Sequence, residues 1–139
     1  MSSETILLQF HNSIVTFFDE MIELFPKEED FIRVRIYLKD QVSVQTVMDE
    51  FTYVINRDNM TLKNLIHERN ISGIMDNNVV TDNLNRDKIY HYKKLWYSPG
   101  VYNEDKKIIW KWLDSFIGIS DKYNKCKVTT PAVSAVQQT

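Results

Sequence analysis

The sequence predicts an all-α protein: a single compact bundle of about six helices over residues 1–127, followed by an extended, uncharged C-terminal arm over residues 128–139. Apolar residues recur at alternating spacings of three and four in most segments, as on the buried face of a helix. Only three glycines and three prolines interrupt the 139 residues, of which 43% are hydrophobic. Long helices and a core to bury them against are therefore both expected.

Residues 3–25 have the clearest helical pattern. One face carries six apolar residues at spacings of three and four: Leu7, Phe10, Ile14, Phe17, Met21 and Leu24. Pro26 ends the helix, because the residue before a proline is disfavoured in the helical region. Further apolar residues beside this stripe indicate that the helix contacts more than one neighbour.

Residues 28–40 fit two structures. Phe31, Val34 and Leu38 recur at helical spacing after an acidic first turn, which suits a helix N-terminus. In the same segment Ile32, Val34 and Ile36 alternate with polar neighbours, which is the period of a half-buried strand. We favour the helix because a strand needs partners, and the other β-like run, over residues 71–80, is short and interrupted. The strand stays open as the alternative.

The middle of the chain is expected to contain three helices. Ser43 is a suitable N-cap for an amphipathic helix over residues 44–55, and a short helix follows over residues 61–69. The asparagine-rich residues 70–85 are typical of a loop. An aromatic, amphipathic helix over residues 86–97 then ends at a Ser-Pro-Gly sequence.

A sixth helix is expected to begin at Asn103. Acidic residues fill its first turn, and Lys122 and Lys125 lie in its last turns, so both ends match the helix dipole. Its buried stripe is expected to be Ile109, Trp112, Phe116 and Tyr123, with Leu113 and Ile119 beside it.

The two halves of the chain carry opposite charge. Residues 1–58 contain 11 acidic and 5 basic side chains, whereas residues 59–139 contain 8 acidic and 12 basic ones. This polarity suits head-to-tail packing between copies, or docking of the two halves on each other, unless folding redistributes the charges.

No catalytic, cofactor-binding or metal-binding residues are expected. The three histidines do not share the spacing that places two metal ligands on one helix face, and Cys126 is the single cysteine. Glycine-rich phosphate-binding motifs and Gly-x-Ser-x-Gly do not occur. We therefore expect a protein that is not an enzyme. The sequence also has no signal-peptide pattern and no apolar run of the ~20 residues that a membrane span needs, so we expect it not to be secreted.

Residues 84–127 combine basic and aromatic side chains, a mixture typical of surfaces that bind single-stranded nucleic acid. Seven basic residues are candidates for such a surface: Arg86, Lys88, Lys93, Lys94, Lys106, Lys107 and Lys111. The simpler interpretation places the aromatic rings in the core and the lysine stems along its edges. A net charge of −2 also argues against a protein that coats nucleic acid.

Trp110 is the leading candidate for a protein contact. It lies about 200° around the sixth helix from Trp112, so it faces away from the core if Trp112 is buried. Tyr97 and Tyr102 lie close to it in sequence, and tyrosine and tryptophan anchor many interfaces. The arm adds three apolar residues that could anchor it on a neighbouring subunit: Val128, Val133 and Val136.

Four short runs of the chain resemble small proteins of nucleocytoplasmic large DNA viruses. They are Leu8-Gln9-Phe10 with Phe17-Phe18-Asp19-Glu20-Met21-Ile22-Glu23-Leu24-Phe25-Pro26, then Lys39-Asp40-Gln41, and Asp105-Lys106-Lys107-Ile108-Ile109-Trp110-Lys111-Trp112-Leu113-Asp114-Ser115-Phe116-Ile117. An abundance of Ile, Lys and Asn, typical of an AT-rich genome, agrees with this resemblance. The resemblance implies a setting, the virion or the infected-cell cytoplasm, and no activity.

We therefore expect a virion structural or assembly protein, a minor capsid component that acts through protein–protein contacts. Its expected partners are other viral proteins, among them the major capsid protein or copies of itself. Two alternatives stay open: a nucleic-acid-associated or regulatory module that uses the basic residues of 86–127, and a host-directed interaction protein.

Overall fold

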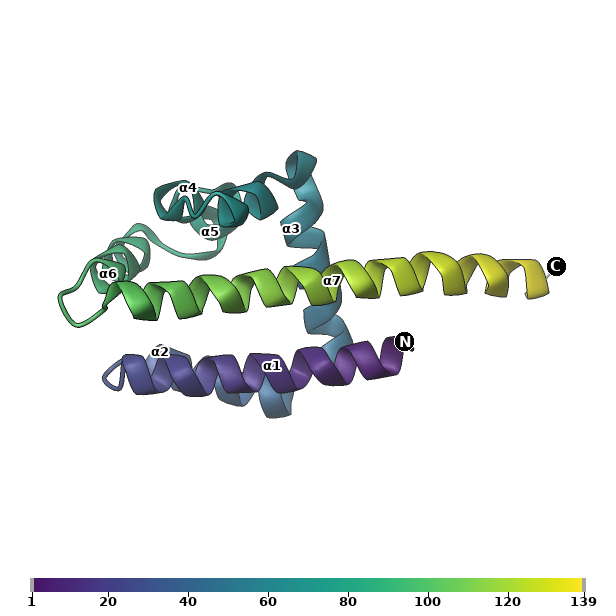
Figure 1. The fold of residues 1–139 in the computed structure, drawn as a ribbon, viewed down its shortest axis with the longest axis horizontal. Helices are drawn as coiled ribbons and strands as arrows, with labels where there is room; N and C mark the ends of the chain where they lie inside the picture. The colour runs from purple at the N-terminus through teal and green to yellow at the C-terminus, as the bar shows by residue number, and fades with distance from the viewer. Residues whose placement is uncertain (1, 139) are drawn as a thin grey trace. The chain divides into compact units, whose positions relative to one another are not determined.

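The computed structural model describes the backbone of residues 2–138 and the side chains of residues 2–127 (Figure 1). The secondary structure of these residues is helical, with no strand among them, so the all-α prediction is confirmed. The chain divides into two compact units: a first unit of Met1–Thr52 and Phe116–Thr139, and a second unit of Tyr53–Ser115.

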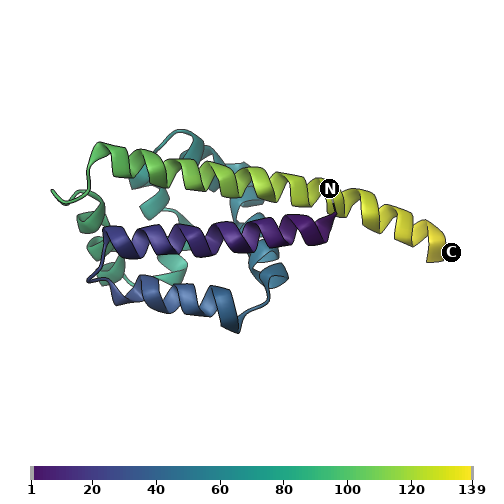
Figure 2. The same ribbon diagram turned by 60° about the horizontal axis from the view of Figure 1, so that its bottom comes forward.

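Helices α1 (Ser3–Leu24) and α2 (Glu29–Ile36) open the first unit and pack against each other (Figure 2). The side chain of Ser2 caps α1 by accepting a 3.2 Å hydrogen bond from the backbone N–H of Thr5, and α1 ends just before Pro26. Helix α2 continues into a π-helical turn, η1 (Tyr37–Gln41). Residues 28–40 therefore form a helix as favoured, and the strand alternative is wrong.

Aromatic rings form the core of the first unit. Phe10 of α1 lies 5.9 Å from the ring of Phe51 and 6.0 Å from that of Phe116, and Phe17 lies 5.4 Å from Phe116. The buried hydrophobic residues of this unit come from α1, from the first part of α3 (Val44–His67) and from α7 (Asn103–Gln138): Ile6, Phe10, Ile14, Met48, Phe116, Ile119 and Tyr123. The predicted stripe of α1 is thus fully buried at Phe10 and Ile14 and half-buried at its other positions.

Two polar contacts join α3 to α7 inside the first unit. The hydroxyl groups of Thr52 and Ser120 lie 2.8 Å apart, and Ser120 is completely buried. The Tyr123 hydroxyl donates a 2.9 Å hydrogen bond to Asp49, and the Lys127 ammonium donates to the same carboxylate oxygen at 3.1 Å. Burial and the neighbouring Asp49 carboxylate raise the pKa of Tyr123, because both disfavour a second negative charge there.

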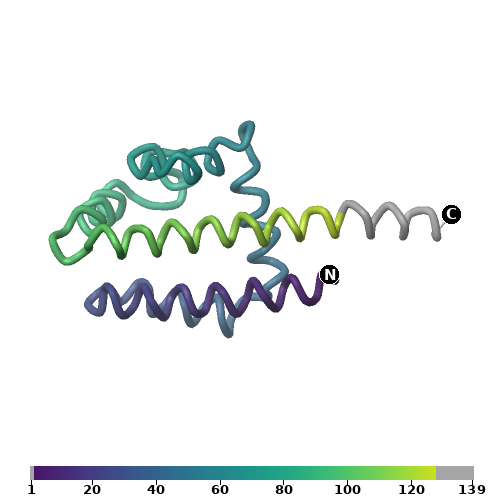
Figure 3. The backbone as a smooth tube through the Cα atoms, viewed as in Figure 1, coloured from purple at the N-terminus to yellow at the C-terminus, as the bar shows by residue number. Residues whose placement is uncertain are grey.

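Helix α3 consists of two helical segments separated by a turn at residues 57–60, where the backbone leaves the helical region (Figure 3). The first segment begins after Ser43, whose side chain accepts a hydrogen bond from Thr46 N–H at 3.1 Å, as predicted. Asp58, Asn59 and Met60 adopt left-handed φ angles of 53°, 57° and 62°. The two separate helices predicted over residues 44–55 and 61–69 are therefore confirmed.

The second unit contains the rest of α3, the short helices α4 (Ile71–Met75) and α5 (Asn78–Asn83), α6 (Arg86–Trp96) and the first part of α7. The loop predicted over residues 70–85 is thus largely wrong. Three of its asparagines are helix N-caps: Asn70 accepts from Gly73 N–H, Asn77 from Val79 N–H and Asn85 from Lys88 N–H, at 2.9, 2.9 and 2.8 Å. Asparagine is common both in loops and at N-caps, so its abundance alone does not separate the two.

The predicted C-terminal arm, residues 128–139, is not extended over its described backbone, because α7 continues as a helix to Gln138. The side chains of these residues lie outside the part of the chain that the structure describes, so the anchors Val128, Val133 and Val136 stay predictions.

Met60→Gly should raise the free energy of unfolding by about 1 kcal/mol. The left-handed conformation costs a residue with a Cβ atom roughly 1–2 kcal/mol and costs glycine nothing, although the greater freedom of glycine in the unfolded chain offsets part of the gain. Urea unfolding measures the difference. Lys111→Gly is the control: it lies on an exposed face within α7, so it should lower stability by about 1 kcal/mol. A loss of stability in both variants would contradict the left-handed turn.

Candidate functional site

Arg69 forms a bidentate ion pair in the second unit. Its guanidinium donates two hydrogen bonds to the Asp114 carboxylate, from Nη1 to Oδ1 at 2.7 Å and from Nη2 to Oδ2 at 2.6 Å. Nη1 also donates to the carbonyl of Ile66 at 3.0 Å. The hydrogen bonds from Arg69 hold the pKa of Asp114 below its usual range, and those same bonds raise the pKa of Arg69. This bidentate pair connects the segment just after α3 to α7.

Trp110 lies against this pair and is buried, with only 9% of its surface exposed. The Arg69 guanidinium carbon is 5.4 Å from the centroid of the Trp110 ring, and the Trp96 ring of α6 meets Trp110 edge-on with centroids 5.4 Å apart. The expectation that Trp110 faces outward as a protein-contact residue is therefore wrong. Its premise fails because Trp112 is only half-buried, and because Trp96 and Arg69 cover the side of α7 on which Trp110 lies.

One side of α6 presents a row of basic and aromatic side chains, which we call the α6 face: Arg86, Tyr90, Lys93, Lys94 and Tyr97, the last being the C-cap residue. Their spacings of three and four place them on one helical stripe. Tyr90 and Tyr97 are 62% and 61% exposed, so their rings are available to a partner. The Lys94 ammonium lies 4.8 Å from the centroid of the Tyr90 ring.

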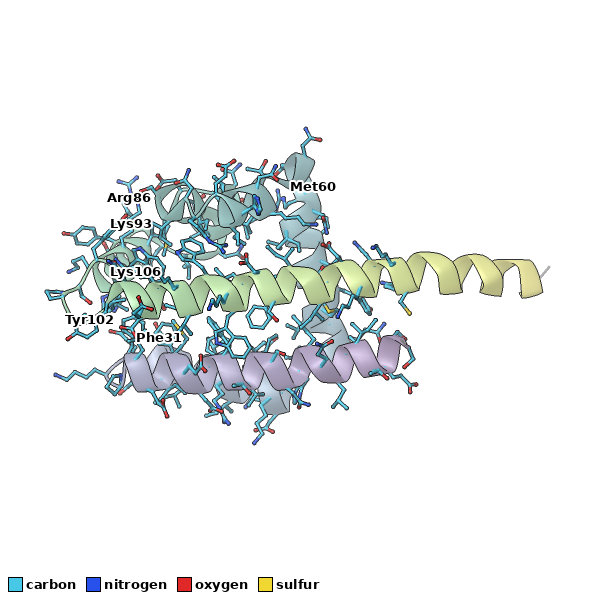
Figure 4. All side chains as sticks on the ribbon, viewed as in Figure 1. Phe31, Met60, Arg86, Lys93, Tyr102 and Lys106 are labelled. Carbon is cyan, nitrogen blue, oxygen red and sulfur yellow. The ribbon has the colours of Figure 1, made fainter. Side chains whose placement is uncertain are left out.

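The start of α7 extends this surface. The Lys106 ammonium lies 5.3 Å from the ring centroid of Tyr97 and 5.4 Å from that of Trp96. Tyr102 is 69% exposed, and its backbone N–H donates to Asp105 at 2.9 Å, which orders the first turn of α7. Figure 4 shows Arg86 and Lys93 on α6 and Tyr102 and Lys106 where α7 begins. Of the predicted protein-contact residues that the structure describes, Tyr97 and Tyr102 are thus exposed and Trp110 is not.

The predicted nucleic-acid candidates divide into two groups. Arg86, Lys93 and Lys94 belong to the α6 face, and Lys106 contacts its end through Tyr97. The remaining three lie elsewhere: Lys88 is about 200° around α6 from Arg86, Lys107 forms an ion pair with Glu104 at 3.2 Å, and Lys111 is exposed further along α7. The structure therefore gathers four of the seven predicted residues.

A pocket of about 500 Å³ opens beside the α6 face, between α4, α5 and α6. Its apolar lining comes from Met75, Leu84 and Ile89, and its polar lining includes Asp76, Thr81, Asn85, Arg86, Tyr90 and Lys93. The Lys93 ammonium donates to Asp76 at 3.0 Å. The sequence does not predict this pocket, because its pattern indicates a loop over residues 70–85, where the structure has the helices α4 and α5 that line the pocket. The apolar residues within that asparagine-rich stretch were the available signal.

A second exposed surface lies in the first unit, on α2. None of the residues of α2 is buried, and the hydrophobic residues Ile32, Val34, Ile36 and the following Tyr37 are all exposed. Phe31 is covered instead, with its ring 5.7 Å from that of Phe25 and 6.4 Å from that of Phe18. The alternation of apolar residues that suggested a strand was in fact the signal of a helix that is apolar on several sides.

The described residues contain no group of three or more His, Cys, Asp or Glu side chains that could hold a metal ion. The ring Nε2 of His11 lies 3.3 Å from the carbonyl oxygen of Lys39, and Cys126 is half-buried. No described helix is long and apolar enough to cross a membrane.

The α6 face and the pocket beside it together present cationic and aromatic side chains that a partner can contact.

Comparisons with protein-family models, with curated proteins and with solved structures found no match for this chain.

Asp114→Asn should lower the stability of the second unit by about 1 kcal/mol or less, since the Arg69 pair is partly exposed and screened. Because the pKa of Asp114 is lowered on folding, the pair stabilises the folded state above the ordinary carboxyl value of 3.8, and this contribution is lost as pH falls through the lower folded value. Tryptophan fluorescence during unfolding at several pH values measures the effect.

The variant should therefore lose less stability on acidification than the wild type. Ser115→Ala is the control: Ser115 is an exposed neighbour of Asp114 on α7 and carries no titratable group, so this variant should leave the acid dependence unchanged. Equal acid dependence of the wild type and Asp114→Asn would contradict a lowered pKa.

Proposed function

We propose that this protein is a non-enzymatic structural or assembly component of the particle of a large DNA virus, a minor capsid-type protein that binds other proteins. The observation that carries the proposal is the group of exposed tyrosines, Tyr90, Tyr97 and Tyr102, on and beside the α6 face. The resemblance of the helical segments to small proteins of such viruses supports the setting, which is the virion or the infected-cell cytoplasm.

Exposed tyrosines support a protein contact for a physical reason. A tyrosine ring contributes a large apolar area at a small cost in side-chain entropy, and its hydroxyl can hydrogen-bond at the rim of an interface. Tyr90 and Tyr97 are further restrained by Lys94 and Lys106, whose ammonium groups lie within 5.3 Å of the ring centroids. Rings that are already restrained lose less freedom when a partner binds.

The exposed hydrophobic residues of α2 give independent support. Ile32 and Ile36 are one helical turn apart, and Tyr37 follows them. Exposed apolar groups of this kind are typical of surfaces that a partner covers. The proposed partners are other viral proteins, including the major capsid protein, or further copies of this chain.

Binding of single-stranded nucleic acid is the second candidate function. It is favoured by the cation–aromatic pairs Lys94–Tyr90 and Lys106–Tyr97, since such surfaces stack bases and neutralise phosphates. It ranks second because the second unit contains ten basic and eight acidic residues, a small excess for a phosphate-binding surface.

Quantitative mass spectrometry of purified particles after a high-salt wash tests the proposal. The protein should be recovered at a copy number that fits the capsid symmetry. Replacing Tyr97 and Tyr102 together by alanine should lower its incorporation about tenfold, because the loss of exposed aromatic anchors weakens an interface by about 1–2 kcal/mol or more. Tyr53→Ala is the matched control, since Tyr53 is equally exposed but lies on α3.

Absence of the protein from washed particles would contradict the proposal, and its presence only in infected cytoplasm would favour a host-directed interaction protein. Fluorescence anisotropy with a single-stranded oligonucleotide tests the second candidate. Binding that weakens steeply with salt, and is lost when Lys94 and Lys106 are replaced by glutamate, would favour the nucleic-acid function instead.

A further inference from the structure

The pocket beside the α6 face has the size and lining of a site for one side chain or a small organic group. Its volume is about 500 Å³, within the range of ligand pockets in proteins. One part of its wall is apolar, from Met75, Leu84 and Ile89. The other part carries charge, so the pocket suits a group that is apolar at one end and charged at the other.

The charges in the pocket favour an anion. Arg86 and Lys93 contribute two positive charges, and Asp76 contributes one negative charge. Lys93 is paired with Asp76 at 3.0 Å, whereas Arg86 forms no ion pair with any residue that the structure describes. The guanidinium of Arg86 is exposed on the same helical stripe as Lys93. One net positive charge and one unpaired guanidinium fit a single monoanion.

A carboxylate fits this pocket better than a phosphate. Lys93 already binds a carboxylate, that of Asp76, at the pocket wall. Since Lys93 and Asp76 are already paired, Arg86 alone is left to neutralise a new anion, and its single charge balances a carboxylate but not a phosphate dianion. A sugar–phosphate is polar throughout and would leave the apolar wall of the pocket exposed to water. An acidic side chain with an aliphatic neighbour would cover that wall with the aliphatic group.

We propose that the pocket formed by Met75, Asp76, Leu84, Arg86, Ile89 and Lys93 binds an acidic side chain of a partner protein together with its aliphatic neighbour. The carboxylate pairs with Arg86 and competes with Asp76 for Lys93, and the aliphatic group packs on Leu84 and Ile89. This inference rests on the proposed function, because it names the chemistry of the partner at the α6 face.

The pocket also explains a division of roles along the α6 face. Tyr97, at one end, supplies contact area, while Arg86, at the other, supplies a charge that selects the partner. Tyr90 lines the pocket and belongs to the face, so it contacts both parts of a bound segment. A charged anchor of this kind orients an approaching acidic partner before the tyrosines make contact.

The test uses the full-length protein and two small probes. N-acetyl-aspartyl-leucinamide carries the carboxylate and the aliphatic group, and N-acetyl-asparaginyl-leucinamide is its neutral twin. In ¹H–¹⁵N correlation spectra, the acidic probe should shift the amide signals of Leu84, Arg86 and Ile89 at millimolar concentration. The neutral probe should bind about tenfold more weakly, because it loses the charge-assisted hydrogen bonds.

Two variants move the affinity in opposite directions. Arg86→Gln should weaken binding of the acidic probe about tenfold, since it removes the unpaired charge. Asp76→Asn should tighten binding about threefold, since it removes the competing carboxylate; general damage to the pocket would not produce this gain. Lys111→Gln is the control and should leave the affinity unchanged, because Lys111 is exposed on α7 and does not line the pocket.

Three outcomes would overturn the inference: no signal shift with the acidic probe, equal affinity for the two probes, or tighter binding of inorganic phosphate than of the carboxylate. The last would favour the nucleic-acid function. Failure of the inference is distinguishable from failure of the proposed function. If the probes do not bind but replacement of Tyr97 and Tyr102 still prevents incorporation into particles, the protein contact stands without the acidic anchor.

Discussion

The ion pair between Arg69 and Asp114 joins the segment that follows α3 to α7, next to the candidate site. Arg69 lies two residues after the end of α3, reaches α7 through two hydrogen bonds below 2.8 Å, and places its guanidinium over the Trp110 ring. Trp110 in turn meets Trp96 of α6, and Trp96 meets Lys106 at the start of α7. A series of pairwise contacts thus runs from the ion pair through Trp110 and Trp96 to Lys106 at the edge of the α6 face.

The α6 face is cationic and aromatic because the tyrosine and basic side chains of this stripe are directed away from the packed side of α6. Trp96 contributes to the packing of the second unit, so Tyr90 and Tyr97 are left on the outer side with the basic residues. The ammonium groups of Lys94 and Lys106 lie over the exposed rings of Tyr90 and Tyr97, which makes the surface both aromatic and cationic. Such a surface suits an acidic protein partner, and the pocket at Arg86 adds a point where one carboxylate can be selected.

In the first unit, the polar side chains between α3 and α7 are paired with each other rather than exposed to a partner. Its core is a cluster of phenylalanine rings, and Ser120, its one described buried polar residue, is paired with Thr52. Asp49 accepts hydrogen bonds from both Tyr123 and Lys127, so the α3–α7 contact of this unit is fully partnered. What stays uncovered is the apolar side of α2, which makes this helix the second surface on which a partner would bury hydrophobic area.

The sequence by itself determined the helices, because their apolar spacing and caps are local: Ser43 caps α3 as predicted, and the break at residues 57–60 falls between the two predicted helices. The sequence did not distinguish asparagines that cap helices from asparagines in loops. An asparagine such as Asn70 is a cap only because its side chain accepts a hydrogen bond from the backbone N–H of Gly73. Of the candidate site, Tyr97, Tyr102 and the basic residues of α6 were predictable as exposed side chains near one another in sequence. The burial of Trp110 and the pocket at Arg86 were not. The burial of Trp110 and the pocket at Arg86 both depend on which helices pack together. Only the tertiary structure decides this packing, because a helical pattern gives the direction of a side chain but not the element that lies opposite it.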